Sequence, residues 1–357
     1  MAHVQEIVVG VDGSKEALHA LDWAAAWAEK CGGSLRIVCA YAIASYSAAA
    51  LDGGLAVLDD EALRHGAERV VSEAEQRAKE KAPTVLVSKL VEAGDATTVL
   101  TEVSREADLV VLGSTGGGGF ADRLLGSVSS AIPAHAKCPV VVVPPHKSGQ
   151  PFLPVRRIVV GVDGSEVAST ALRKAADAAV MWDAELTVVA AVPIAMGGGV
   201  MSWMPTAVDR QALINDIRGS LDKAVTEAVD GREVRVAKHA LDGNPAALLT
   251  EFSTAVDLVV VGTRGRGGFA GMLLGSTSQT VLNHSTCPVM TVPKPHSVLA
   301  ETLNRQTPGL QRRLFSWACS QHCAACRSGV SICCGSLTRV ARETVCPRSS
   351  GDRAPLS

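Results

Sequence analysis

The chain has 357 residues, of which 47% are apolar and 20% are charged, and its formal net charge is -2. This length and composition suit two or three globular domains and exclude a wholly disordered protein. No apolar run reaches the roughly 18 residues that a membrane-spanning helix needs, and the small net charge argues against a nucleic-acid partner held by bulk charge.

The first predicted element is a strand over residues 7–11, which are mostly β-branched. Asp12 and Gly13 form a turn after it, and Ser14 can cap a helix that ends at Gly32. Because no basic and apolar leader precedes this strand, we expect a cytoplasmic protein. The further elements predicted in this half are a strand over 35–41, a helix over 59–81, a strand over 84–94, a helix over 95–107 begun by Asp95, a strand over 107–113, a helix over 127–135 and a strand over 138–145.

The octapeptide IVVGVDGS of residues 7–14 recurs at residues 158–165, and the order of elements recurs with it. Asn244 and Pro245 are a typical helix start, with a capping residue followed by proline at the first helical position. The elements predicted in the second half are a strand over 157–162, a helix over 166–179, a strand over 185–192, a helix over 208–229, a strand over 232–241, a helix from 245, a strand over 256–262, a helix from 276 and a strand over 287–293.

Strands that alternate with helices predict parallel sheets joined by right-handed helical crossovers. We therefore predict an α/β protein of two doubly wound, five-stranded, Rossmann-like domains, and for each we take the strand order 3-2-1-4-5 as the working hypothesis. The predicted boundaries are 1–147 for the first domain, 148–154 for a linker, 155–296 for the second domain and 297–357 for an unrelated tail that we expect to be disordered.

Each half has a glycine-rich loop between its fourth strand and the next helix. Such a loop lets an anion approach the backbone closely, and the first N–H groups of the following helix lack partners within it. The crevice of this fold lies where strand order reverses, so Asp12 and Asp163, which follow the first strands, would form its other wall. The loop pattern, glycine-x2-glycine-x9-glycine-serine, occurs at Gly113, Gly116, Gly126 and Ser127 and again at Gly262, Gly265, Gly275 and Ser276.

These features together resemble the universal stress protein family in its tandem form, in which two domains are fused. The resemblance covers about residues 4–145 and 155–293 and rests on the VDGS turns, the glycine pattern and closing strands that begin with Cys-Pro-Val. It implies ATP binding in both halves, with Mg²⁺ as an optional ion, and a role in stress response. It also implies antiparallel pairing of the two fifth strands within the chain, which would cover two sheet edges.

The resemblance also implies the nucleotide contacts, residue by residue. Cys39 and Ala40 are alternatives for a strand-2 position near the adenine, as are Ala190 and Ala191, and the serine hydroxyls would add donors at the helix starts. With Arg264 and Arg266 added for their charge, the predicted site residues are Asp12, Gly13, Cys39, Ala40, Gly113, Gly116, Gly126, Ser127, Val128 and Ser129 in the first half, and Asp163, Gly164, Ala190, Gly262, Arg264, Gly265, Arg266, Gly275, Ser276, Thr277 and Ser278 in the second.

The two glycine loops differ in charge. Arg264 and Arg266 stand where the first half has Thr115 and Gly117. A guanidinium beside a polyphosphate gains charge-assisted hydrogen bonds, so we expect tighter and more salt-sensitive ATP binding in the second half. The alternative is that both arginines point into water.

Two enzyme classes lack their motifs. A dinucleotide-dependent dehydrogenase would carry G-x-G-x-x-G directly after the first strand, and a Walker-type ATPase needs a lysine in its glycine loop; neither is present. We also find no convincing general base for hydrolysis. We therefore predict an ATP-binding regulator whose occupancy changes its contacts with an unidentified protein partner or its assembly, including as a homodimer. The alternative is a slow ATPase or phosphotransfer protein on the same fold.

The tail differs in composition from the rest of the chain. Residues 301–357 contain eight arginines, no lysine and three acids, a net charge of +5, which leaves -7 for residues 1–300. Cysteine and histidine are zinc ligands, but the spacings here do not form two matched pairs, so we expect a disordered or out-of-frame extension. The residues concerned are Cys319, His322, Cys323, Cys326, Cys333, Cys334 and Cys346.

Overall fold

The computed structural model describes residues 4–42, 60–116, 125–145, 152–192, 210–266 and 273–294. The elements of the first half are β1 (Glu6–Gly10), α1 (Lys15–Cys31), β2 (Ser34–Tyr41), α2 (Asp60–Lys81), β3 (Leu86–Ala93), α3 (Ala96–Val103), β4 (Leu109–Gly113), α4 (Ser127–His135) and β5 (Val140–Val143). Those of the second half are β6 (Arg157–Gly161), α5 (Glu166–Trp182), β7 (Glu185–Val192), α6 (Arg210–Val229), β8 (Arg235–Asp242), α7 (Pro245–Phe252), β9 (Leu258–Gly262), α8 (Ser276–His284) and β10 (Val289–Val292).

The strands of the described residues form one sheet in the order β3-β2-β1-β4-β5-β10-β9-β6-β7-β8. Neighbouring strands within each half are parallel, so the predicted order 3-2-1-4-5 is confirmed in both halves. At the centre β5 and β10 are antiparallel, with Met290 opposite Val141. The pairing of the fifth strands within the chain is therefore confirmed as well.

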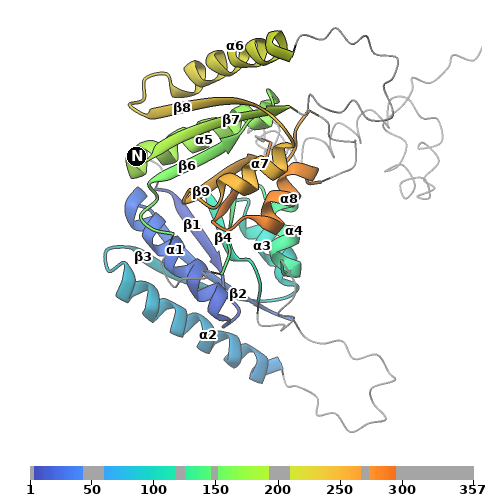
Figure 1. Cartoon of the computed structure of the whole chain (residues 1–357). Helices are drawn as coiled ribbons and strands as arrows, with labels where there is room; N and C mark the ends of the chain where they lie inside the picture. The colour runs from blue at the N-terminus through green and yellow to red at the C-terminus, as the bar shows by residue number, and fades with distance from the viewer. Residues whose placement is uncertain are drawn as a thin grey trace, which may run out of the picture. The chain divides into compact units, whose positions relative to one another are not determined.

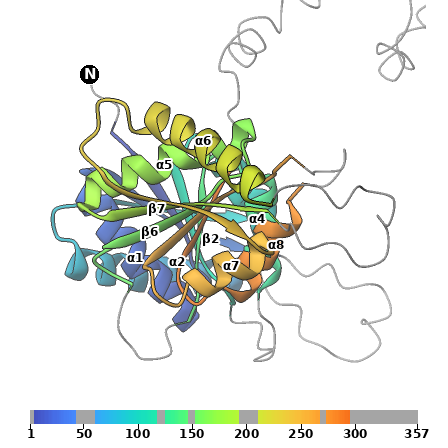
Figure 2. The same cartoon turned by 45° about the horizontal axis from the view of Figure 1, so that its top comes forward.

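Helices cover both faces of this sheet (Figures 1 and 2). One apolar cluster joins α1, α2, α5 and α6 to the sheet, and a second joins α3, α4, α7 and α8 to the opposite face. Strand β4 shows how one strand serves both clusters, because Leu109 and Val111 belong to the first and Val110 and Leu112 to the second. This alternation explains why the central strands read as continuous apolar runs.

The three helix starts predicted from capping residues are confirmed. The side chain of Ser14 accepts a hydrogen bond from the backbone N–H of Ala17 at the start of α1. Asp95 accepts one from Thr98 at the start of α3, and Asn244 accepts bonds from two N–H groups at the start of α7. Each cap satisfies donors that the helix itself leaves unpaired.

The end of α5 was predicted wrongly. We expected it at Ala179, but the helix continues to Trp182 and ends at Asp183, which has a left-handed φ of 53°. The matching helix α1 ends at Gly32, the residue type that adopts this conformation most easily. Aspartate tolerates the left-handed region better than most residues, so the same kind of helix end occurs without a glycine to reveal it.

The two outer strands carry matched lysines. Lys89 of β3 forms an ion pair with Glu75 of α2 at 2.6 Å, and Lys238 of β8 pairs with Asp222 of α6. Charged lysines on edge strands oppose the addition of a further strand from another molecule.

Two parts of the predicted organisation lie outside the described residues: most of the 148–154 linker and the whole 297–357 tail with its cysteines. Within the described ranges, no helix is long and apolar enough to cross a membrane.

Candidate nucleotide site in each half

Each half has a cavity at the carboxyl ends of its first and fourth strands. The first cavity, of about 370 Å³, is bounded by the ends of β1 and β4, the turn at Asp12 and the start of α4. The second, of about 380 Å³, has the same walls in β6, β9, the turn at Asp163 and the start of α8. The crevice predicted from strand order is therefore found twice, and two segments about a hundred residues apart line each copy.

The Asp12 and Asp163 carboxylates are oriented by their own turns. One oxygen of Asp12 accepts hydrogen bonds from the backbone N–H of Ser14 at 3.0 Å and from its hydroxyl at 2.5 Å. The matching oxygen of Asp163 accepts a bond from the Ser165 N–H at 3.0 Å. Both carboxylates are thereby held at the mouth of a cavity.

The glycine loop touches the aspartate in each half. A Cβ atom placed on Gly116 would collide with Oδ2 of Asp12, and one placed on Gly265 would collide with Oδ2 of Asp163. A larger residue at either position would displace the aspartate carboxylate, because the loop backbone lies directly against it. The second glycine of the spacing pattern is required to bring the two walls of the cavity together.

The helices α4 and α8 differ from α1, α3, α5 and α7 at the capping residue that precedes the helix. Helix α4 begins after Gly126 and α8 after Gly275, and neither has a side-chain cap on its first N–H groups. By contrast, α1, α3, α5 and α7 are each capped by their own serine, aspartate or asparagine. Uncapped N–H groups at a helix start favour a bound anion, as does the positive end of the helix dipole.

Ser129 and Ser278 hold the loop in place. The Ser129 hydroxyl is buried and donates to the carbonyl oxygen of Ser114 at 2.5 Å. Ser278 donates to the carbonyl of Gly262 at 2.8 Å in the second half. Both residues line their cavities, but their hydroxyl protons are directed to the loop backbone. Ser127 and Ser276, at the first helical positions, also line the cavities.

The second strand of each half contributes every other residue to its cavity. Val38 and Ala40 of β2 line the first cavity, and Val189 and Ala191 of β7 line the second. Cys39 instead packs into the cluster on the opposite face, where burial and the nearby Asp12 charge raise the pKa of its thiol to about 11. Ala190 lies in the same cluster. Of the alternatives open in the sequence, Ala40 and Ala191 are therefore the ones with side chains on the cavity side.

The loop arginines separate in the structure. Arg264 lines the second cavity, and its Nε lies 3.4 Å from the Leu273 carbonyl oxygen. Arg266 is not among the lining residues; its backbone N–H donates to Asp163 Oδ2 at 2.7 Å and its guanidinium donates to the Gly164 carbonyl at 3.2 Å. Gly117, its counterpart in the first half, lies outside the described residues.

The structure brings most of the implied residues to the cavities. Gly13 and Gly164 lie in the adjoining turns, with φ of 82° and 76°. Of the predicted site residues, those that line the cavities are Asp12, Ala40, Gly113, Gly116, Gly126, Ser127, Val128 and Ser129 in the first half, and Asp163, Gly262, Arg264, Gly265, Gly275, Ser276, Thr277 and Ser278 in the second.

Sequence reasoning missed a wall made by α3 and α7. Ala96 and Leu100 of α3 line the first cavity, and Pro245 and Leu249 of α7 occupy the matching places in the second. A Cβ atom on Gly10 would approach Leu112 to 2.7 Å and Leu100 to 3.3 Å, so the glycine at the end of β1 leaves room for this wall. The recurring glycine within each first strand was the available signal.

Within the described residues, the cavities offer apolar walls, loop backbone and few charged side chains. Asp12 is the charged residue among those that line the first cavity, and Asp163 and Arg264 are those that line the second. The described residues contain no group of three metal-ligating side chains. Such a surface can hold a planar apolar group beside an anionic one, which is binding chemistry.

The family model for the universal stress protein family matches residues 3–144 and 154–293. The chain belongs to that family. Universal stress protein Rv2623 of Mycobacterium tuberculosis is 33% identical over 290 residues, covering 80% of this chain and 95% of that protein. Universal stress protein Rv1996 of the same organism is 32% identical over 303 residues, covering 80% of this chain and 93% of that one.

Solved structures agree on the fold of this universal stress protein. The crystal structure of a universal stress protein from Archaeoglobus fulgidus matches with a TM-score of 0.59 at 20% identity, covering 81% of this chain and 96% of that one. A protein from Pseudomonas aeruginosa described as a putative universal stress protein matches with a TM-score of 0.54 at 18% identity, covering 82% and 94%. The tandem arrangement is thus found along nearly the whole length of these relatives.

Proposed function

We propose that this universal stress protein binds ATP in both cavities and that occupancy regulates its contacts with a protein partner or its assembly. The observation that carries the proposal is the pairing, in each half, of an uncapped helix start with an aspartate across a glycine-lined cavity. The α4 and α8 starts would hold the phosphates. The apolar walls from Val38, Ala40 and Leu100, with their counterparts, would hold the base.

Substitutions at Gly126 and Gly275 test the phosphate part of this proposal. A Cβ atom on Gly126 would lie 3.3 Å from the Ser129 hydroxyl oxygen, and one on Gly275 would lie 3.4 Å from that of Ser278, so small side chains fit with slight adjustment. Aspartate at either position would cap the helix itself and repel a phosphate. The double variant Gly126→Asp/Gly275→Asp should therefore stay folded and lose ATP binding in calorimetric titration.

Two kinds of neutral substitution at the same positions separate the effect of the aspartate charge from the effects of capping and of added bulk. Gly126→Asn and Gly275→Asn cap the same N–H groups without charge and should weaken ATP binding less than aspartate. Gly126→Ala and Gly275→Ala add only the Cβ atom and should weaken it least. Each single aspartate variant should retain one binding event of the two. ATP binding by the double aspartate variant at the wild-type affinity would contradict the proposal.

The regulatory part needs a separate measurement. A pull-down from stressed cells, with and without ATP, should recover a partner whose abundance changes with nucleotide for the wild type and not for the double aspartate variant. ADP release over hours, measured in parallel, separates a slow ATPase from a regulator, because turnover that the aspartate variants abolish would favour the enzyme.

A further inference from the structure

The contact between the two halves is asymmetric, because the residues that the first half contributes differ from the matching residues of the second half. The repeated octapeptides match α1 to α5, and the repeated Cys-Pro-Val segments match β5 to β10. Under this matching Val141 corresponds to Met290, and these two residues lie directly opposite each other at the centre of the antiparallel pair. The approximate twofold axis that relates the halves therefore passes through a pair of unlike residues.

The central pair is buried and complementary in size. Val141 is 0% exposed and Met290 is 3% exposed, and both belong to the cluster under α1 and α5. Two first halves paired in the same way would place valine against valine and leave the space of the longer side chain empty. Two second halves would place methionine against methionine and overfill it. Interiors are packed densely enough for either change to be destabilising.

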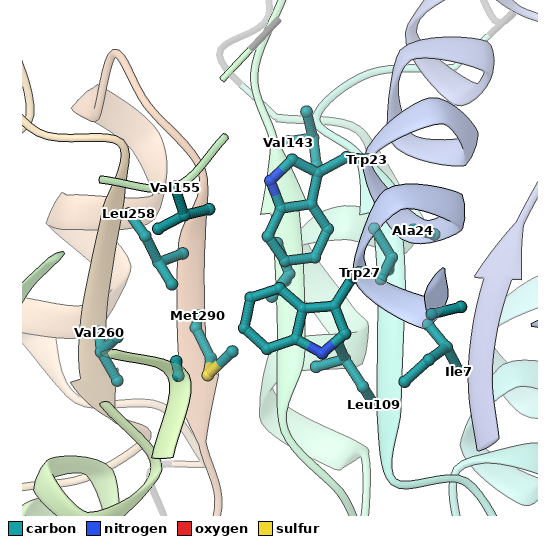
Figure 3. Packing of buried hydrophobic residues seen from close by; sticks show 14 of the residues in the cluster. Ile7, Trp23, Ala24, Trp27, Leu109, Val143, Val155, Leu258, Val260 and Met290 are labelled. Carbon is teal, nitrogen blue, oxygen red and sulfur yellow. The ribbon is translucent and has the colours of Figure 1, made fainter. Parts of the chain in front are cut away.

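An aromatic contact also joins the two halves, and the matching residues on the other side of the twofold axis are not aromatic. Trp23 and Trp27 of α1 are stacked with ring centroids 4.8 Å apart, and Trp27 lies 6.1 Å from Trp182 of α5. Lys30 Nζ lies 5.8 Å from the Trp182 ring centroid. In Figure 3 the two α1 tryptophans lie between Val143 and Leu109 of the first half and Met290 of the second.

The counterparts of these residues cannot repeat the contact. Trp27 corresponds to Ala178, Trp182 to Cys31 and Lys30 to Met181. A pair of first halves would set Trp27 against Cys31, and a pair of second halves would set Ala178 against Trp182. Neither pair would form the ring contact or place a cation over a tryptophan, interactions that add to simple burial.

We propose that the β5 edge and helix α1 of the first half select the second half of the chain as their partner and reject another first half. The selecting contacts are the Val141–Met290 pair and the Trp27–Trp182 pair. The fifth-strand edge of a first half is thereby matched to the fifth-strand edge of a second half, and two like edges are mismatched.

A size exchange in the intact chain tests the central pair. Val141→Met and Met290→Val each imitate one like-with-like pairing and should lower the urea midpoint of unfolding. The exchange Val141→Met/Met290→Val restores one long and one short side chain and should recover at least half of the combined loss. The matched control is Val8→Met with Met290→Val. Val8 is buried on the face of the sheet opposite to that of Met290, so the losses from these two substitutions should simply add. Additive losses in the exchange variant would overturn the proposal.

The Trp27–Trp182 contact can be tested in the intact chain by a double-mutant cycle. Trp27→Ala and Trp182→Ala should each lower the urea midpoint of unfolding. The double variant should lose clearly less than the sum of the two single losses, because either substitution already removes the ring contact. Strictly additive losses would also overturn the proposal.

Discussion

The two halves share a backbone plan and differ in the side chains attached to it. Their cavities are nearly equal in volume, about 370 and 380 Å³, and each is closed by the same contact between a loop glycine and an aspartate. The differences lie at the rim of the cavities, where Arg264 replaces Thr115, and at the interface, where tryptophans are matched to smaller residues. Geometry that depends on glycine has therefore been kept twice, while charge and size have diverged.

The largest expected effect concerns the interface. Trp27 is 6% exposed, so Trp27→Ala should lower the free energy of unfolding by roughly 3–5 kcal/mol through lost burial and a cavity. Trp182→Ala should cost markedly less, because that side chain is only partly buried. Urea unfolding followed by circular dichroism measures both. Equal losses would mean that the interface does not rely more on α1 than on α5.

The next effect compares the glycines that end β4 and β9. A Cβ atom on Gly113 would lie 2.8 Å from backbone atoms of Glu16, whereas one on Gly262 would lie 2.9 Å from a methyl group of Val167 and 3.2 Å from the Arg264 carbonyl. A methyl group can move aside more easily than a helix backbone. We expect Gly113→Ala to cost about 2–3 kcal/mol of unfolding free energy and Gly262→Ala about 1 kcal/mol. A larger loss in the second half would contradict this ranking.

A smaller effect concerns ATP affinity in the second cavity. Arg264→Ala should weaken binding there about two- to fivefold, or roughly 0.5–1 kcal/mol for an exposed charge, and should reduce its salt dependence. Calorimetry in a Gly126→Asp background isolates this cavity in the intact chain. The reciprocal Thr115→Arg, measured in a Gly275→Asp background, should strengthen the first cavity and increase its salt dependence. An unchanged salt slope in both variants would show that the arginine points into water.

The smallest effect concerns Arg266. Because its guanidinium donates to the Gly164 carbonyl in an exposed setting, Arg266→Ala should change ATP affinity by about 0.5 kcal/mol or less, with little change in salt dependence. The same background and titration serve for this variant. A salt slope that falls as much as for Arg264→Ala would place the Arg266 side chain at the phosphates instead.

The fold was largely predictable because its signals are local and repeated. Apolar runs and capping residues predicted the strands and most helix ends, and the second copy of VDGS predicted the duplication; the strand order was a hypothesis about the fold class that the structure confirmed. The end of α5 was missed because Asp183 takes a left-handed conformation that sequence statistics assign to glycine. In the site, the glycine pattern predicted the loop and the uncapped helix starts. It could not predict the α3 and α7 walls, which come from residues with no unusual chemistry of their own.

The sequence by itself determined the duplication, the two α/β units and the loop that opens each candidate site, because repeats, periodicity and glycine spacing are properties of the chain. Only the tertiary structure decided which side of β2 faces the cavity, that Ser129 holds the loop, and that Arg264 and Arg266 lie in different places. It also set Trp27 against Trp182 across the halves. These outcomes depend on packing between residues far apart in the chain, and no local pattern records such contacts.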